Sequence, residues 1–230
     1  MIRCFRLKNI LISLAIILSS LLLSIGIVAV TEYTDTPFLP YTIVLDAGHG
    51  GRDKGCSGTN GGIESDINLS ITFQLEKILK DFGFKVVLTR KDSNGLYDTN
   101  ATNYKVSDME KRKAIITQAN PDFVISIHQN SYPDTSLRGA QAFYKKGNEE
   151  CKDLASAIQE TLVSQIPHAR QEANFGDYYI LNESPANAVI VECGYLTNIE
   201  EEILLQSSEY QHELAYAIAC GIVKYFDTYN

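Results

Sequence analysis

An uninterrupted apolar run, Phe123-Val124-Ile125-Ser126-Ile127, constrains the fold more than any other feature of this sequence. A strand that faces water on one side alternates apolar and polar residues, whereas a strand covered on both faces does not. The run therefore predicts a central strand with helices on both sides. Sheets of this kind are mainly parallel, because helices connect their neighbouring strands.

The rest of the chain alternates between strand-like and helix-like segments. Short β-rich runs predict further strands, at 41–45, 85–89, 139–144, 178–181 and 188–191. Apolar residues at helical spacing predict helices at 67–82, 154–166 and 214–225. A further helix is predicted at 107–119, where Ser107 and Glu110 form a capping-box pattern at its start. We expect a single α/β domain with a mainly parallel central sheet flanked by helices.

The N-terminus has a different character. Three basic residues precede an uncharged apolar stretch over residues 10–30, and acidic residues follow it. A membrane-spanning helix needs about 20 such residues, and basic residues mark its cytoplasmic side. We therefore expect a signal-anchor at 1–31 that crosses the membrane through residues 10–30, a linker at 32–41 and an exported domain at 42–230. Cleavage of a signal peptide, giving a secreted protein, is the alternative.

Charge and cysteine content narrow the class of protein. The net charge is −8, and no cluster of Lys and Arg follows residue 10, which excludes a nucleic-acid partner. Cys4 precedes the apolar stretch, and Cys56, Cys151, Cys193 and Cys220 follow it. These four could form two disulfides, but without a CxxC pair or a dense framework they are typical of buried free thiols.

Several predicted strands end in residues that can bind a metal or move a proton. His49 follows the first strand in a glycine-rich turn, His128 follows the apolar run, and Glu192 ends the last strand. The carboxyl ends of parallel strands meet at one edge of a sheet, and Glu64, at the start of the next helix, belongs to the same edge. Two histidines and a carboxylate leave one tetrahedral position of zinc open, and a second carboxylate can act as general base. These residues cover every role needed to hydrolyse an amide.

Each of these residues also has a simpler interpretation. A lone histidine after a strand is more often a hydrogen-bonded structural residue. A glutamate such as Glu64 at a helix start is usually an exposed residue favoured by the helix dipole. Glu192 is harder to explain in this way, because an unpaired charge buried at a strand end is costly.

Four strings of residues resemble the motifs of the zinc N-acetylmuramoyl-L-alanine amidases of the Amidase_3 type. They are VLDAGHGG at 44–51, IE at 63–64, SIHQN at 126–130 and VECGYLTN at 191–198. The strings occur in the family's order, and the resemblance covers residues 42–228. It departs from the common pattern at Gln129, where alanine is usual, and at Tyr195, where phenylalanine is usual.

The resemblance implies a role for each matching residue. One Zn²⁺ would be bound by His49, Glu64 and His128, and Glu192 would be catalytic. Two further matches are Arg112, expected to position Glu192 or the substrate unless it is a surface arginine, and Asn130, expected to line the substrate site. Some relatives insert a helix that plugs the zinc site between the second histidine and the catalytic glutamate; here strands, one helix and a loop are predicted to fill that stretch, so no plug is expected.

The implied function is hydrolysis of the amide between the lactyl group of N-acetylmuramic acid and L-alanine in peptidoglycan. Another zinc peptidase, acting within the stem peptide, and a catalytically inactive wall-binding protein are the alternatives. The predicted layout of one membrane segment and one catalytic domain is similar to the short amidases of spore-forming bacteria, which act on the spore cortex in sporulation and germination. An activating partner protein that docks near the zinc rim fits this layout.

Overall fold

The computed structural model describes Ile17, Ser19 and residues 39–229. Apart from those two residues, the predicted signal-anchor at 1–31 lies outside the described residues, as do positions 32–38 of the predicted linker. The chain divides into two units, Met1–Phe38 and Leu39–Asn230. No helix in the described part of the chain combines the length and apolar character that crossing a membrane requires.

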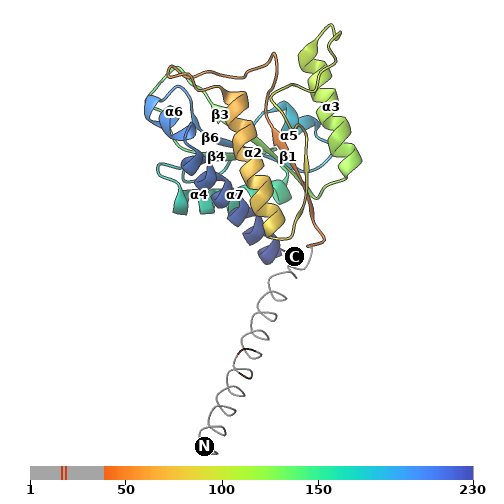
Figure 1. Cartoon of the computed structure of the whole chain (residues 1–230), viewed down its shortest axis with the longest axis vertical. Helices are drawn as coiled ribbons and strands as arrows, with labels where there is room; N and C mark the ends of the chain where they lie inside the picture. Colours follow the sequence, from red (N-terminus) through yellow and green to blue (C-terminus); the bar gives the residue numbers. More distant parts are fainter. Residues whose placement is uncertain (1–16, 18, 20–38, 230) are drawn as a thin grey trace, which may run out of the picture. The chain divides into compact units, whose positions relative to one another are not determined.

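A six-stranded sheet lies at the centre of the second unit (Figure 1). Its strands are β1 (Thr42–Ala47), β2 (Lys85–Leu88), β3 (Phe123–Asn130), β4 (Gln141–Tyr144), β5 (Asn174–Phe175) and β6 (Ala188–Tyr195), in the spatial order β2-β1-β3-β6-β4-β5. All neighbours are parallel except β4 and β6. The prediction of a single α/β domain with a mainly parallel sheet is confirmed.

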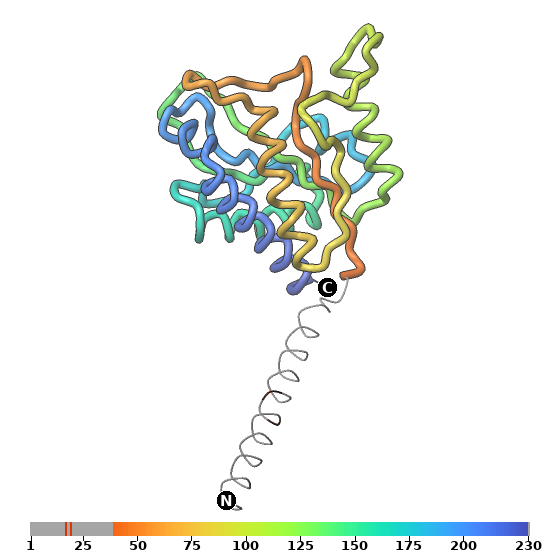
Figure 2. Tube along the Cα trace, in the orientation of Figure 1, coloured from red at the N-terminus to blue at the C-terminus, as the bar shows by residue number. Residues whose placement is uncertain are grey.

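Helices cover both faces of the sheet, as the apolar run predicts. One face carries α2 (Glu64–Asp81), α4 (Glu149–Gln165) and α7 (Ser208–Tyr229), and the other carries α3 (Tyr104–Ala119) and α5 (Tyr179–Glu183). Between β6 and α7 the chain forms the short helix α6 (Ile199–Leu205). Figure 2 shows the same arrangement along the Cα trace.

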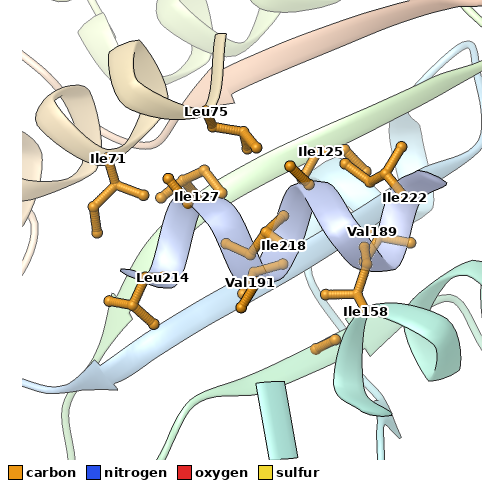
Figure 3. Close-up of a cluster of buried hydrophobic side chains, with 14 of the residues drawn as sticks. Ile71, Leu75, Ile125, Ile127, Ile158, Val189, Val191, Leu214, Ile218 and Ile222 are labelled. Atoms are coloured by element: carbon orange, nitrogen blue, oxygen red, sulfur yellow. The ribbon is translucent and has the colours of Figure 1, made fainter. Parts of the chain in front are cut away.

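The larger core lies under α2, α4 and α7. Figure 3 shows that Ile125 and Ile127 of β3 and Val189 and Val191 of β6 meet the apolar side chains of these helices, which include Ile218 of α7. A smaller cluster on the opposite face contains the alternate residues of the same strands, Val124 and Ile190, together with residues of α3 and α5. Successive side chains of a strand point to opposite faces, so both faces of β3 and β6 are buried.

Three local predictions need correction. The segment at 178–181 is not a strand: it forms the start of α5, whose Ile180 and Leu181 are buried in the smaller cluster. The predicted helix at 107–119 begins earlier, because Asn103 accepts a hydrogen bond from the Val106 amide and caps α3. Ser107 instead accepts a hydrogen bond from the Asp98 amide through its hydroxyl.

A further helix, α6, was not predicted. Its cap is the Asn198 side chain, which accepts hydrogen bonds from the amides of Glu200 and Glu201. All four cysteines of the described residues are free, as expected.

Candidate metal centre

His49, Glu64 and His128 come together at the carboxyl edge of the sheet. Oε1 of Glu64 lies 3.2 Å from Nε2 of His49 and 3.0 Å from Nδ1 of His128. One ligand atom from each of the three lies within 4.8 Å of the other two. The three residues belong to the loop after β1, the first position of α2 and the strand β3, so the fold brings them together as their places in the sequence predict.

The turn after β1 holds His49 in an uncommon backbone conformation and leaves space for the ring of His128. His49 has a φ of 61°, in the left-handed region, where a residue other than glycine is uncommon. At Gly48 a Cβ atom would lie 2.3 Å from the ring of His128, so a side chain there would displace that ring. The carbonyl oxygen of His49 accepts a hydrogen bond of 2.6 Å from the Arg112 guanidinium, which holds the turn in place.

Glu64 is fixed by both of its carboxylate oxygens. Its Oε2 accepts a hydrogen bond of 2.7 Å from the Cys56 amide, and its Oε1 accepts one of 3.2 Å from the Gln129 amide. Burial raises the pKa of Glu64, but the hydrogen bonds to the two histidine rings outweigh burial and hold it well below its usual value. The carboxylate is therefore ionised and directed between the rings, where a bound cation is stabilised.

Asp53 is a site residue that the sequence interpretation missed. Its Oδ2 lies 3.0 Å from Nδ1 of His49, so the other ring nitrogen, Nε2, is the one that faces Glu64. Burial lowers the pKa of His49, but Glu64 and Asp53 raise it to about 9. A carboxylate on the far nitrogen of a ligating histidine fixes the orientation of the ring. The only signal in the sequence is an aspartate four positions after His49.

The donor set fits zinc. Two imidazole nitrogens and one carboxylate oxygen are the ligands of many catalytic zinc sites, which keep a fourth position for water or substrate. His49 and His128 have 25% and 22% of their side-chain surface exposed, so both rings are accessible to solvent.

Glu192 lies next to His128 on the neighbouring strand, where the two residues are in register. It is 6% exposed, and its Oε2 has no hydrogen-bond partner among the described residues. Burial raises the pKa of Glu192 to about 7, an effect that His128 partly opposes. A buried carboxyl group that titrates near neutral pH can both accept and release a proton, which is what general acid–base catalysis requires.

Arg112 is fully buried, so the alternative of a surface arginine is wrong. Its guanidinium forms ion pairs with Asp46 and Asp108 and donates to the carbonyl oxygens of Ala47 and His49. All of these partners lie on β1, the turn that follows it, or α3, and none of them is Glu192 or Asn130.

Asn130 lies at the end of β3. Its side-chain oxygen accepts a hydrogen bond from the Ser131 amide, and its carbonyl oxygen accepts one from Leu196. The residue does not line the cavity that adjoins the metal group in the described part of the chain.

A buried glutamate anchors the loop that leads into Glu64. Glu202 of α6 is completely buried, and its carboxylate accepts hydrogen bonds from the amides of Asn60, at 2.7 Å, and Gly62, at 2.9 Å. The sequence did not predict α6 and therefore gave no reason to single out Glu202. The contact connects the segment before α2 with the segment that follows β6.

The fold and the site together define an α/β enzyme of the metal-dependent hydrolase class. The model of the Amidase_3 family, described as N-acetylmuramoyl-L-alanine amidase, matches residues 43–224. The germination-specific N-acetylmuramoyl-L-alanine amidase of Bacillus subtilis is 33% identical over 189 residues, which span 80% of this chain and 79% of the relative. Because the family model matches well over half of the chain, the chain belongs to the Amidase_3 family.

Solved structures agree with this assignment. The CwlD amidase from Clostridioides difficile, solved in complex with the GerS lipoprotein, is similar with a TM-score of 0.78 and 35% identity, covering 82% of this chain and 99% of that one. The catalytic domain of CwlV from Bacillus (Paenibacillus) polymyxa gives a TM-score of 0.71 at 28% identity, covering 81% and 98%. The predicted activity is confirmed: the protein is an N-acetylmuramoyl-L-alanine amidase of peptidoglycan, a cell-wall enzyme that acts outside the cytoplasm.

Proposed function

We propose that His49, Glu64 and His128 bind one Zn²⁺ and that Glu192 is the general base for hydrolysis of the amide between the lactyl group and L-alanine. The observation that carries this proposal is the position of Glu64 Oε1, 3.2 Å from one ring nitrogen and 3.0 Å from the other, with Glu192 beside His128 in the sheet. When bound, zinc would polarise the carbonyl group of the substrate amide and lower the pKa of a water molecule.

The remaining chemistry belongs to residues of this chain. Asp53 holds the His49 ring so that Nε2 faces the metal position. Arg112 holds the backbone of the same turn, and through it the histidine. Glu192 takes a proton from the attacking water and delivers it to the alanine nitrogen, which leaves as an amine. Its Oε2, which is buried and has no hydrogen-bond partner among the described residues, supports this role.

Substitutions separate metal binding from catalysis. In the full chain, Glu192→Gln keeps the shape of the side chain but removes the base. Bound zinc should stay at the wild-type level while turnover falls by roughly 10²–10⁴-fold, the usual contribution of a general base. Turnover within a few-fold of the wild type would exclude Glu192 as the base.

Substitution of a proposed metal ligand should instead reduce the amount of bound zinc. His49→Ala, His128→Ala and Glu64→Ala should each lower the zinc content, measured by elemental analysis of the purified protein. Zinc contents equal to the wild type in all three variants would reject the ligand assignment. Product analysis completes the experiment, because a free L-alanine N-terminus appears only when the lactyl amide is cut, and not when a peptidase acts within the stem.

We also propose a role in the spore cortex. Similarity to the germination-specific amidase of Bacillus subtilis and to the CwlD amidase supports this role, and the GerS complex of the latter supports a partner protein. We propose that such a partner docks near the zinc rim and activates the enzyme. Such a partner would lower the ordering cost of substrate binding without supplying chemistry. The muramic-lactam content of the cortex in a deletion strain tests the role, which normal levels would rule out.

The same enzyme is proposed to be anchored by residues 1–31, with the linker at 32–41 and the catalytic domain at 42–230 outside the membrane. The apolar stretch at 10–30 and its basic N-terminal flank support the anchor. Cell fractionation distinguishes the two forms. A shortened, freely soluble protein as the main species would favour the cleaved signal peptide instead.

A further inference from the structure

A cavity of about 250 Å³ adjoins the proposed zinc ligands on the face of the sheet that α3 and α5 cover. His49 and His128 are among its lining residues, and the others include residues of α3, of the loop before α3 and of the segment that forms α5, which lie on the same side of the sheet in Figure 1. Most of the wall is aromatic or apolar, provided by Tyr97, Tyr104, Met109, Tyr178, Tyr179 and Ile180.

The charged groups of this cavity are almost all engaged with one another. Asp46 and Asp108 form short ion pairs with the buried Arg112, whose guanidinium also donates to backbone carbonyls. Asp53 contacts the ring of His49 at 3.0 Å. The charges of these four groups are therefore satisfied within the protein.

Lys105 is the exception among the described residues that line the cavity. Its ammonium lies 3.7 Å from Oδ1 of Asp53, near the limit for an ion pair, and its side chain is 62% exposed. An ammonium group has three donor hydrogens, and one long contact leaves donors free for a ligand. A hydrogen bond from this ammonium to a carboxylate is charge-assisted, which makes it stronger than one between neutral groups.

We propose that Lys105 determines substrate specificity by binding a carboxylate of the stem peptide in this cavity. The inference rests on the proposed zinc site, because that site places the scissile amide beside the cavity. On the glycan side of that amide lies an N-acetylated sugar without charge, whereas the stem peptide carries carboxylates. A cation beside aromatic walls, next to the reacting bond, therefore matches the peptide side and the carboxylate of the residue after L-alanine.

A purely structural role for Lys105 makes a different prediction. If its contact with Asp53 only helped to orient His49, removing the ammonium would affect every substrate equally. Binding of a substrate carboxylate instead predicts an effect that depends on whether that carboxylate is present. The two roles are separated by pairing one substitution in the protein with one in the substrate.

The experiment uses the full-length protein loaded with zinc and two muramoyl dipeptides whose γ-carboxyl group is capped as a methylamide. One has a free α-carboxylate on the D-glutamate after L-alanine, and the other has a carboxamide in its place. The wild type should prefer the carboxylate substrate by about tenfold in kcat/KM, the scale expected for a hydrogen bond between charged groups. Lys105→Met should lower kcat/KM for that substrate by about the same factor and leave the carboxamide substrate within about twofold.

Two further variants act as controls. Lys111→Met changes an exposed lysine on the same helix, paired with Asp98 outside the cavity, and should leave the substrate preference unchanged. Lys105→Arg keeps the charge and should retain most of the preference for the carboxylate substrate. The zinc content of all three variants should equal that of the wild type. An equal loss on both substrates, or a preference that survives in Lys105→Met, would overturn the proposal.

Binding of the product provides a readout that does not depend on turnover. Calorimetry with the free L-Ala-D-Glu dipeptide, its γ-carboxyl group capped as a methylamide, should show about tenfold weaker binding to Lys105→Met than to the wild type, while the capped dipeptide with an α-carboxamide should bind both proteins alike. If turnover is absent but this discrimination is seen, the assignment of the zinc site or of Glu192 fails and the role of Lys105 stands. Equal binding of the two dipeptides to the wild type would reject the role of Lys105.

Discussion

Replacing Asp46 by asparagine should destabilise the fold at neutral pH and remove part of its sensitivity to acid. Asp46 lies near the end of β1, is 2% exposed, and accepts hydrogen bonds of 2.7 Å from the hydroxyls of Thr89 and Ser126. It is also an ion-pair partner of Arg112, which holds the His49 turn. The substitution removes a charge without changing the size of the side chain.

The magnitude follows from the pKa of the buried carboxyl group. Burial raises the pKa of Asp46, but Arg112, Ser126 and Thr89 together lower it from 3.8 to about 2. That difference corresponds to about 2 kcal/mol, because each pKa unit is worth about 1.4 kcal/mol. Because the pKa is lower in the folded state, this stability is present above pH 4, approximately, and is lost as the pH falls towards 2. Breaking a buried ion pair by removing one partner costs about 3–5 kcal/mol, which sets the upper limit at pH 7.

Urea unfolding at several pH values between 7 and 3 tests this reasoning. The free energy of unfolding of Asp46→Asn should be about 2–5 kcal/mol lower than that of the wild type at pH 7. This difference should become smaller as the pH falls below 4. Asp81→Asn is the matched control, because Asp81 forms an exposed pair with Lys77 on α2, where ion pairs contribute little. The argument would be refuted if the difference in free energy of unfolding between Asp46→Asn and the wild type stayed constant from pH 7 to pH 3. It would also be refuted if that difference were no larger than the one for Asp81→Asn.

Three further substitutions test how the site is held. Asp53→Ala should lower zinc affinity by about 10–100-fold in competition with a chelator, because His49 loses the carboxylate that orients it; unchanged affinity would remove Asp53 from the site. Gly48→Ala should displace the His128 ring and cost roughly 1–3 kcal/mol in thermal unfolding, and wild-type stability with full zinc content would contradict this. Glu202→Gln should lower the free energy of unfolding by about 1–3 kcal/mol, because the NH₂ group of glutamine would face a backbone N–H that now donates to the carboxylate. A variant as stable as the wild type would show that the loop does not depend on this contact.

The meeting of His49, Glu64 and His128 at one edge of the sheet could be predicted from the sequence, because parallel strands present their carboxyl ends there. The resemblance to the family, and not periodicity, singled these residues out as metal ligands. His128 and Glu192 lie in register on neighbouring strands. The position of Glu64 also follows, since the helix after the glycine-rich loop begins at that residue.

The polar support of the site could not be predicted in this way. Arg112 and Asp46 are 66 positions apart, and their contact depends on where α3 crosses the sheet. The buried residues of α3 are Asp108, Arg112 and Ile116, so its inward face is mostly charged and carries no apolar periodicity. The segment at 178–181 is rich in β-branched and aromatic residues, but burial of Ile180 and Leu181 against the sheet outweighs this local preference and makes it helical.

The two faces of the sheet contribute differently to activity. The face under α2, α4 and α7 carries the larger apolar core, which fixes the strands, and it reaches the site only through the start of α2, where Glu64 and Asn68 lie. The face under α3 and α5 has a smaller apolar cluster and a buried network of Asp46, Arg112 and Asp108. Well-packed apolar residues can often replace a buried ion pair without loss of stability, so stability alone does not explain this network. The network also donates a hydrogen bond to the carbonyl oxygen of His49, so it connects the buried charges of this face to the turn that carries the proposed metal ligand beside the cavity.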